Sequence, residues 1–275
     1  MKQNTKSIII RFAIKLCAFI TIAIALTIIS YILITGIPEL NAGLFAWHYT
    51  SENLSMVSSI INTIIIVFLS LLFALPIGVF TALYLTEYAH RDSVFVKIIR
   101  TVSDTLSGIP SIVYGLFGYL AFSIGLHFGY SILAGSMTLA LMILPVIMRT
   151  SEEAFLAISQ SIREGSYGLG AGKARTIFSI IIPTAMPGIV SGIILSTGRI
   201  IGETAALIYT AGTVAGFPSS LLSSGRTLSV HMYVLISEGL HMDAARGVAV
   251  VLLVLVLSMN ALSDLIAKRM KKKNG

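Results

Sequence analysis

Long runs without a charged residue are the feature that most constrains this sequence. The stretch 53–86 carries no charge, and neither does 105–148, which is long enough for two membrane crossings. A helix needs about 20 apolar residues to cross roughly 30 Å of hydrocarbon. Only 11% of the residues are charged and 56% are hydrophobic, whereas roughly a quarter of an ordinary globular domain is charged. The chain is therefore predicted to be an integral membrane protein.

Gaps between charges place six helical spans. We expect them at Leu16–Ile37, at Ser59–Leu83, at two segments of 105–148 divided by the polar break 127–131, at a segment beginning near Pro183, and around 247–262. The first run is longer than the apolar core of a signal peptide, so it is expected to remain as a span. Cys17, the single cysteine, lies in that span and permits no internal disulfide.

Basic residues set the predicted orientation, because short loops rich in Lys and Arg stay in the cytoplasm. Such residues cluster before the first span, after the second and fourth spans, and at the C-terminus. An even number of spans puts all four clusters on one side. We therefore expect a cytoplasmic N-terminal segment 1–15, one transmembrane domain over 16–267 and a basic cytoplasmic tail 268–275. The net charge of +7 then reflects orientation and attraction to anionic lipid, and predicts no nucleic-acid partner.

One amphipathic segment lies between the second and third spans. Apolar residues recur at helical spacing from Phe95 to Leu106, with Arg91, Lys97 and Arg100 among them. This pattern is typical of a helix on the inner membrane surface, and we expect it to turn through an elbow into the third span.

A polar, glycine-rich loop over 149–183 interrupts the apolar pattern. Two capping boxes, Thr150 with Glu153 and Ser161 with Glu164, predict that helices start there. The run 168–174 superficially resembles a phosphate-binding loop, but Tyr167 stands where a P-loop requires Gly, and Ala174 where it requires Ser or Thr. The loop is therefore predicted to be folded and to bind no nucleotide or other cofactor itself.

The loop resembles the EAA loop of bacterial ABC importer permeases. Residues 164–166 read Glu-Gly-Ser, Gly170 follows at the family's spacing, and residues 180–183 read Ile-Ile-Ile-Pro. The runs 108–117 and 202–207 are similar to signatures of the phosphate-specific permeases. The resemblance implies a type I ABC importer permease (MetI-like) fold. The loop departs from the usual family pattern at three positions. Gly165 and Gly168 each cost about 1 kcal/mol of helix propensity relative to Ala, and Ala174 stands where a bulky aromatic is common.

The same resemblance implies partners and a role for the loop. Its short helix would dock in a cleft of an ATPase subunit, through Ser161, Arg163, Glu164, Gly165, Ser166, Gly170 and Pro183. The expected assembly holds a second permease subunit, two copies of the ABC ATPase and an extracytoplasmic phosphate-binding protein in the cell membrane. The chain itself is then not an enzyme.

Two charges stand alone inside the expected fifth span. Arg199 and Glu203 are spaced one helical turn apart, so they are predicted to share a helix face. A charge deep in the bilayer costs at least about 2.5–3.5 kcal/mol and normally faces a bundle interior or a water-filled path. We expect Arg199, Glu203 and Thr204 to line an anion path, with Arg199 binding phosphate through two parallel hydrogen bonds. The alternative is a purely structural ion pair.

Other classes of function fit the sequence less well. An intramembrane enzyme would need a nucleophile or metal constellation, and no such motif is present in the sequence. His127 and His231 are interpreted as loop and interface residues rather than metal ligands. A channel or secondary transporter would also use buried charges, but it would leave the long loop unexplained. Among ABC permeases, import of another oxyanion such as sulfate or molybdate is the nearest alternative.

Overall fold

The computed structural model describes residues 2–274, apart from 91, 92, 238 and 240. Within that part of the chain every regular element is helical. The long helices are α1 (Lys2–Gly36), α2 (Val57–Leu83), α5 (Ile132–Leu156), α8 (Ile182–Ile201) and α11 (Met242–Asn274). Arg91 and the side chains of the terminal basic residues 2–6 and 266–274, which entered the orientation argument, lie outside what the structure describes.

The number of spans agrees with the sequence prediction. Five helices in the described residues are long and apolar enough to cross a membrane. A sixth span is formed when α3 (Val94–Ser107) is counted with α4 (Ser111–Gly118) and its π-helical continuation η4 (Tyr119–Gly125). The break between η4 and α5 falls at the polar segment 127–131, as expected. The all-α, six-span prediction is confirmed.

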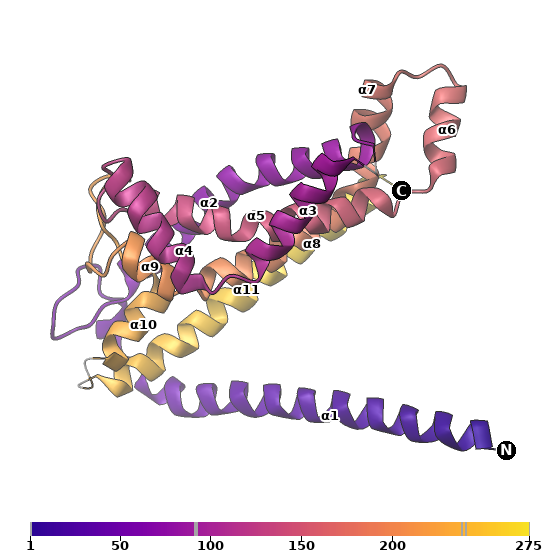
Figure 1. Cartoon of the computed structure of the whole chain (residues 1–275). Helices are drawn as coiled ribbons and strands as arrows, with labels where there is room; N and C mark the ends of the chain where they lie inside the picture. The colour runs from indigo at the N-terminus through magenta and orange to yellow at the C-terminus, as the bar shows by residue number, and fades with distance from the viewer. Residues whose placement is uncertain (1, 91–92, 238, 240, 275) are drawn as a thin grey trace.

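The centre of the bundle is built on α5. This helix packs against α2 and α8, and α8 packs against α11 (Figure 1). On the inward side of α5, the side chains of Leu139, Ile143 and Ile147 are completely or almost completely buried. Small residues bring neighbouring helices close: a Cβ on Gly78 of α2 would lie 2.8 Å from Ile147. Because lipid is as apolar as the core, close packing of this kind, rather than apolar burial alone, holds membrane helices together.

The elbow predicted between the amphipathic segment and the third span is present. The axes of α3 and α4 differ by 105°, and the turn contains Pro110, whose ring disfavours a helical conformation in the residue before it. Two ion pairs connect α3 to α5. Arg100 lies 2.5 Å from Glu152, and Arg149 lies 3.1 Å from Asp104.

The two ends of the bundle differ in structure. At one end α6 (Gln160–Gly168) and α7 (Lys173–Thr176) project beyond the long helices, and the first turns of α1 and the last turns of α11 point toward that end (Figure 1). The other end carries α9 (Ala205–Thr210), α10 (Leu228–Ser237) and the short 3₁₀ turns η1 (Ile37–Glu39) and η2 (Ala42–Phe45). Buried Leu44, Met56 and Leu228 form a core there.

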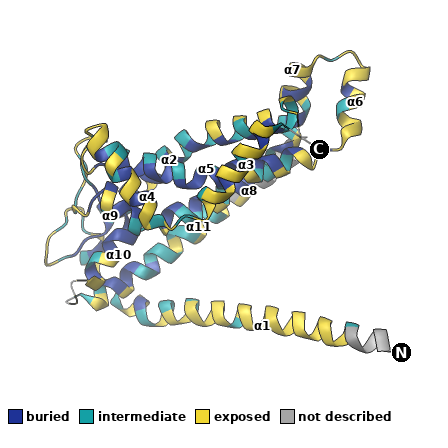
Figure 2. Ribbon diagram, viewed as in Figure 1, coloured by how far each residue is buried: buried dark blue, intermediate teal, exposed yellow. Residues whose placement is uncertain are grey.

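Helix α1 diverges from the rest of the molecule. Its C-terminal end touches α11, where a Cβ on Gly36 would lie 2.4 Å from the carbonyl oxygen of Arg246. Along most of its length its apolar side chains are exposed (Figure 2).

Three sequence predictions about helix ends are wrong. Thr150 starts no helix: α5 continues to Leu156, and the Thr150 hydroxyl donates to Val146 within it. The cap of α6 is Ser159 rather than Ser161, because the Ser159 hydroxyl accepts from the Ser161 amide. The fifth span begins before Pro183, since one continuous helix runs from Lys173 through the π-turn η5 (Ile177–Ile181) to Ile201.

Candidate coupling and anion sites

Arg163 fastens α6 to the helical bundle. Its Nε and Nη2 atoms donate to Glu87 Oε1 at 3.1 and 2.8 Å, and its remaining bonds go to the carbonyl oxygens of Ile158 and Phe155 at the end of α5. Glu87 lies in η3 (Tyr84–Tyr88), the π-turn that continues α2. Only 11% of the Arg163 side chain and 5% of the Glu87 side chain are exposed. One guanidinium thus bonds to two backbone carbonyls at and just beyond the end of α5 and neutralises a buried carboxylate of η3.

A second contact fixes α6 against the next helix. The hydroxyl of Ser166 lies 2.8 Å from that of Thr176 in α7, and both side chains are buried. The resemblance implied that Ser166 would be one of the residues that dock in the ATPase cleft. The structure places it instead on the side of α6 that faces α7.

The opposite side of α6 is open. Glu164, Gly165 and Gly168 are exposed, and a Cβ added at either glycine would meet no atom within 4 Å. Leu169, which follows the helix, is 91% exposed. Gly170 has φ +80°, a conformation that glycine adopts without steric cost. Backbone geometry, rather than lack of space, therefore explains the glycine at 170.

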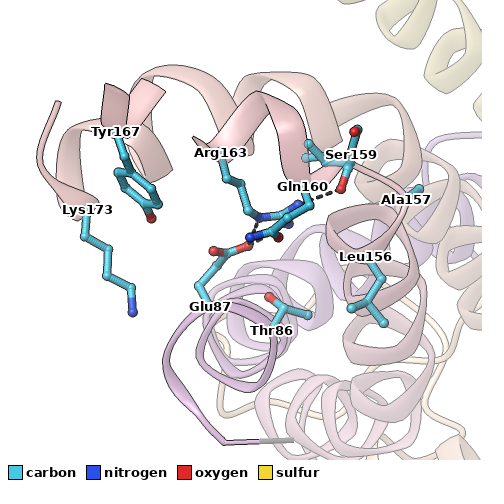
Figure 3. Close-up of a pocket in the computed structure, with 10 residues that line it drawn as sticks. Thr86, Glu87, Leu156, Ala157, Ser159, Gln160, Arg163, Tyr167 and Lys173 are labelled. Atoms are coloured by element: carbon cyan, nitrogen blue, oxygen red, sulfur yellow. Dashed lines mark hydrogen bonds and ion pairs between the residues drawn. The ribbon is translucent and has the colours of Figure 1, made fainter. Parts of the chain in front are cut away.

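A cleft of about 990 Å³ separates α6 from the ends of α2 and α5. Figure 3 shows Arg163 and Glu87 pointing toward one another across it, with Tyr167 and Lys173 at its other side. The Lys173 ammonium lies 4.2 Å from the centre of the Tyr88 ring. Pro183 lies apart from this cleft, at the second position of α8.

Arg199 occupies the last turn of α8, where the free carbonyl groups of a helix end favour a cation. The expected ion pair with Glu203 is absent from the described residues, because α8 ends at Ile201 and the two side chains do not share a helix face. Glu203 Oε1 instead accepts a hydrogen bond from the Ala206 amide in α9 at 3.1 Å. Thr204 is the residue that precedes α9. The helix therefore ends between Arg199 and Glu203.

The two signature runs of the sequence meet at this break. A Cβ on Gly115 of α4 would lie 2.8 Å from the Cα of Ala206 in α9, so the backbones of these helices touch. Arg199 lies within electrostatic range of the Tyr114 hydroxyl, which donates to the carbonyl oxygen of Leu106. The elbow between α3 and α4 and the break between α8 and α9 thus lie close to one half-buried cation.

Sequence reasoning missed three polar residues of these regions. Glu87 ended the uncharged run 53–86 and was visible as an isolated carboxylate, but nothing in the pattern connected it with Arg163. Tyr114 was recognised only as part of a signature. Nothing in the sequence pattern singled out Arg226, which is buried.

Comparison with known proteins identifies the family. Residues 74–273 match the family described as binding-protein-dependent transport system inner membrane component. The chain is 32% identical to a probable ABC transporter permease, YqgI, of Bacillus subtilis, over 94% of each chain. It is 36% identical to phosphate transport system permease protein PstA 1 of Mycobacterium tuberculosis, over 70% of this chain and 63% of that protein. A PstA homolog of Mycoplasma pneumoniae is 31% identical over 79% of this chain, which spans 34% of that relative.

Solved structures agree on the fold. The MetNI methionine ABC transporter in an inward-facing conformation aligns with a TM-score of 0.60 at 20% identity, over 78% of this chain and 94% of that one. A bacterial alginate ABC transporter aligns with a TM-score of 0.61 at 19% identity, over 91% and 96%. The MetI-like prediction is therefore confirmed at the level of fold. The chain belongs to the inner-membrane components of binding-protein-dependent ABC transport systems.

Proposed function

We propose that this ABC importer permease carries inorganic phosphate into the cytoplasm. The relatives named as phosphate permeases support this substrate. The main structural support is Arg199, because its charge is half-buried and, among the described residues, unpaired. A phosphate that leaves water loses hydrogen bonds, which fixed donors and positive charge can replace. Arg199 is a half-buried cation whose charge no carboxylate of the described residues neutralises through an ion pair. Thr204 and the Tyr114 hydroxyl add polar groups near the same break.

The proposed assembly follows from the family. The chain would pair with a second, PstC-like permease, two copies of a PstB-like ATPase and a PstS-like phosphate-binding protein. It would contribute no catalytic residue of its own, since hydrolysis of ATP takes place in the ATPase. The positive-inside rule assigns α6 and both termini to the cytoplasm and α10 to the outer side.

Coupling to the ATPase would pass through α6. Its open side, with Glu164, Gly165 and Gly168, offers a surface that a partner can approach closely, while Arg163 and Ser166 hold its other side to the bundle. A force on α6 would therefore reach α2 and α5 through fixed contacts. Gly170 shapes the turn that leads away from the helix, and Pro183 lies where the following helix enters α8.

Uptake competition tests the substrate. Cells that express the complete importer should accumulate labelled phosphate in an ATP-dependent manner, and unlabelled phosphate should compete far better than sulfate or molybdate. Equal competition by sulfate or molybdate would show that the importer does not select phosphate over these oxyanions. Uptake that persists with a hydrolysis-deficient ATPase would point to a channel or secondary transporter.

Single cysteines on a Cys17→Ala background test the orientation. An impermeant thiol reagent should label position 219 from outside intact cells and position 160 only after permeabilisation. Labelling of position 160 from outside would reverse the proposed topology.

A further inference from the structure

Arg226 is a buried arginine whose guanidinium forms no ion pair or hydrogen bond with the described residues. It lies two residues before α10, a helix at the end of the bundle opposite α6 (Figure 1), and is only 4% exposed. No described residue forms an ion pair with it or accepts a hydrogen bond from its guanidinium. A buried cation without a counter-charge is costly. Such a residue calls for a ligand.

The unpartnered atoms of Arg226 define what kind of ligand fits. They are Nε and Nη2, which form one edge of the guanidinium. That edge presents two parallel N–H donors, the geometry that binds carboxylate or phosphate oxygens in pairs. The face of the same group lies over the Tyr49 ring, with 4.6 Å between the guanidinium carbon and the ring centre. Tyr49 therefore orients the plane of the guanidinium and does not bond to its Nε and Nη2 edge, which is buried and has no partner among the described residues.

Two hydrogen-bond acceptors without partners belong to residues near Arg226. His231 is fully buried, and its Nε2 lies 3.2 Å from the carbonyl oxygen of Leu54. Burial, and secondarily the nearby Arg226, lower the pKa of His231 to about 3, so the ring is neutral near pH 7. Because a carbonyl oxygen only accepts, Nε2 carries the proton and the unpartnered Nδ1 is an acceptor.

Asn62 of α2 supplies a second acceptor. Its side-chain nitrogen donates to the carbonyl oxygens of Arg226 and Gly216, which fixes the amide orientation, and its Oδ1 has no partner. The unpaired donors of Arg226 and the unpaired acceptors of His231 and Asn62 thus belong to the same end of the bundle.

We propose that Arg226 is the centre of a second anion site, at the outer end of the permease, for a tetrahedral oxyanion that carries a protonated oxygen. The Nε and Nη2 edge binds two oxygens of the anion, and His231 Nδ1 or Asn62 Oδ1 accepts from the protonated oxygen. Sulfate near pH 7 has no such proton, so these acceptors favour phosphate. The site would be where phosphate enters the permease before it reaches Arg199. The proposal rests on the proposed function for the identity of the anion.

Phosphate-dependent stabilisation of the assembled importer tests the site. The complete complex of both permeases and the ATPase, in nanodiscs and phosphate-free buffer without binding protein, is unfolded by heat at increasing concentrations of inorganic phosphate. Ligand that binds only the folded state raises the unfolding midpoint. The wild type should show a saturable rise, and Arg226→Met should lose most of it. Arg226→Lys should need at least about tenfold more phosphate, because it keeps the charge without the paired donors.

Arg246→Met is the matched control, because Arg246 is an exposed arginine at the same end of the bundle that pairs with Asp243. It should respond to phosphate as the wild type does. Without phosphate, Arg226→Met should assemble and unfold no earlier than the wild type, since the buried charge it removes had no ion pair or hydrogen bond with the described residues and methionine can still pack against Tyr49. If Arg226→Met does not assemble, Arg226→Lys decides.

Three results would overturn the site: a wild-type complex that does not respond to phosphate, an Arg226→Met complex that responds normally, or an Arg226→Lys complex with unchanged phosphate affinity. An equal response to sulfate would overturn the role of the acceptors. None of these outcomes depends on uptake. Failure of the proposed function would appear separately, as a wild-type importer that does not accumulate phosphate.

Discussion

Arg163 and Arg226 are both buried, but their surroundings are opposite. Arg163 donates to one carboxylate and two backbone carbonyls at the α6 end of the molecule. Arg226, at the other end, has no partner for the Nε and Nη2 atoms of its guanidinium. The bonds of Arg163 join α6 to the ends of α2 and α5, whereas the buried charge of Arg226 is left without compensation by the described residues, which is costly. Arg199 resembles Arg226 in this respect, since it has no ion pair among the described residues.

The largest effect is expected at Arg163. Arg163→Gln leaves Glu87 buried without its cation, which should cost about 3–5 kcal/mol of stability. We expect a large fall in membrane abundance, and α6 should become accessible to protease in inverted vesicles. The double variant Arg163→Gln with Glu87→Gln should recover a substantial part of the abundance. A single variant of normal abundance and protease resistance would show that the pair does not hold α6.

Coupling should be sensitive to bulk on the open side of α6. Gly165 is exposed, and a Cβ added there would meet no atom within 4 Å, so the Gly165→Trp subunit should insert normally. Its ATP-driven uptake should fall at least tenfold, because the added bulk would block docking of α6 in the proposed partner cleft. Gly165→Ala is the matched control. It should transport as the wild type does, and alanine should favour the helix by up to about 1 kcal/mol.

Normal uptake by an assembled Gly165→Trp importer would remove this side of α6 from the coupling interface. We prefer position 165 to position 170 for this test, because a large side chain at Gly170 would also strain a backbone at φ +80°.

The smallest effect is expected at Arg149. Its partners Asp104 and Glu153 are exposed to about the same extent as Arg149 itself, at 66%, 67% and 65%. Exposed ion pairs contribute about 0–1 kcal/mol. Arg149→Gln should therefore leave abundance and uptake within about twofold of the wild type. A loss as large as that of Arg163→Gln would mean that exposure does not separate the two kinds of arginine.

The fold was largely predictable from the sequence because membrane spans depend on local composition. Uncharged runs located α2 and α5, and the polar segment 127–131 located the break before α5. The errors concern helix ends. A Ser or Thr three residues before Glu is a frequent pattern, and at Thr150 the apolar face of α5 simply continues, so its hydroxyl bonds within the helix.

The site was less predictable because its contacts join distant parts of the chain. The spacing of Arg199 and Glu203 suggested a shared helix face, but the helix ends between them, and the signal was a single glycine at 202. Glu87 is 76 residues from Arg163, and no periodicity links them. Tyr49 and Arg226 meet only because α2 and α10 pack together.

Uptake per assembled importer in Arg199 variants tests whether Arg199 binds the phosphate that is transported. Membrane abundance and labelled phosphate uptake are measured together for Arg199→Gln, Arg199→Lys and the double variant Arg199→Gln with Glu203→Gln. Because Glu203 bonds to the Ala206 amide rather than to Arg199, we predict normal abundance in both single variants. Uptake should be nearly abolished in Arg199→Gln, poorly rescued in Arg199→Lys and not restored in the double variant. Full uptake by the double variant would contradict the account and make Arg199 a structural residue.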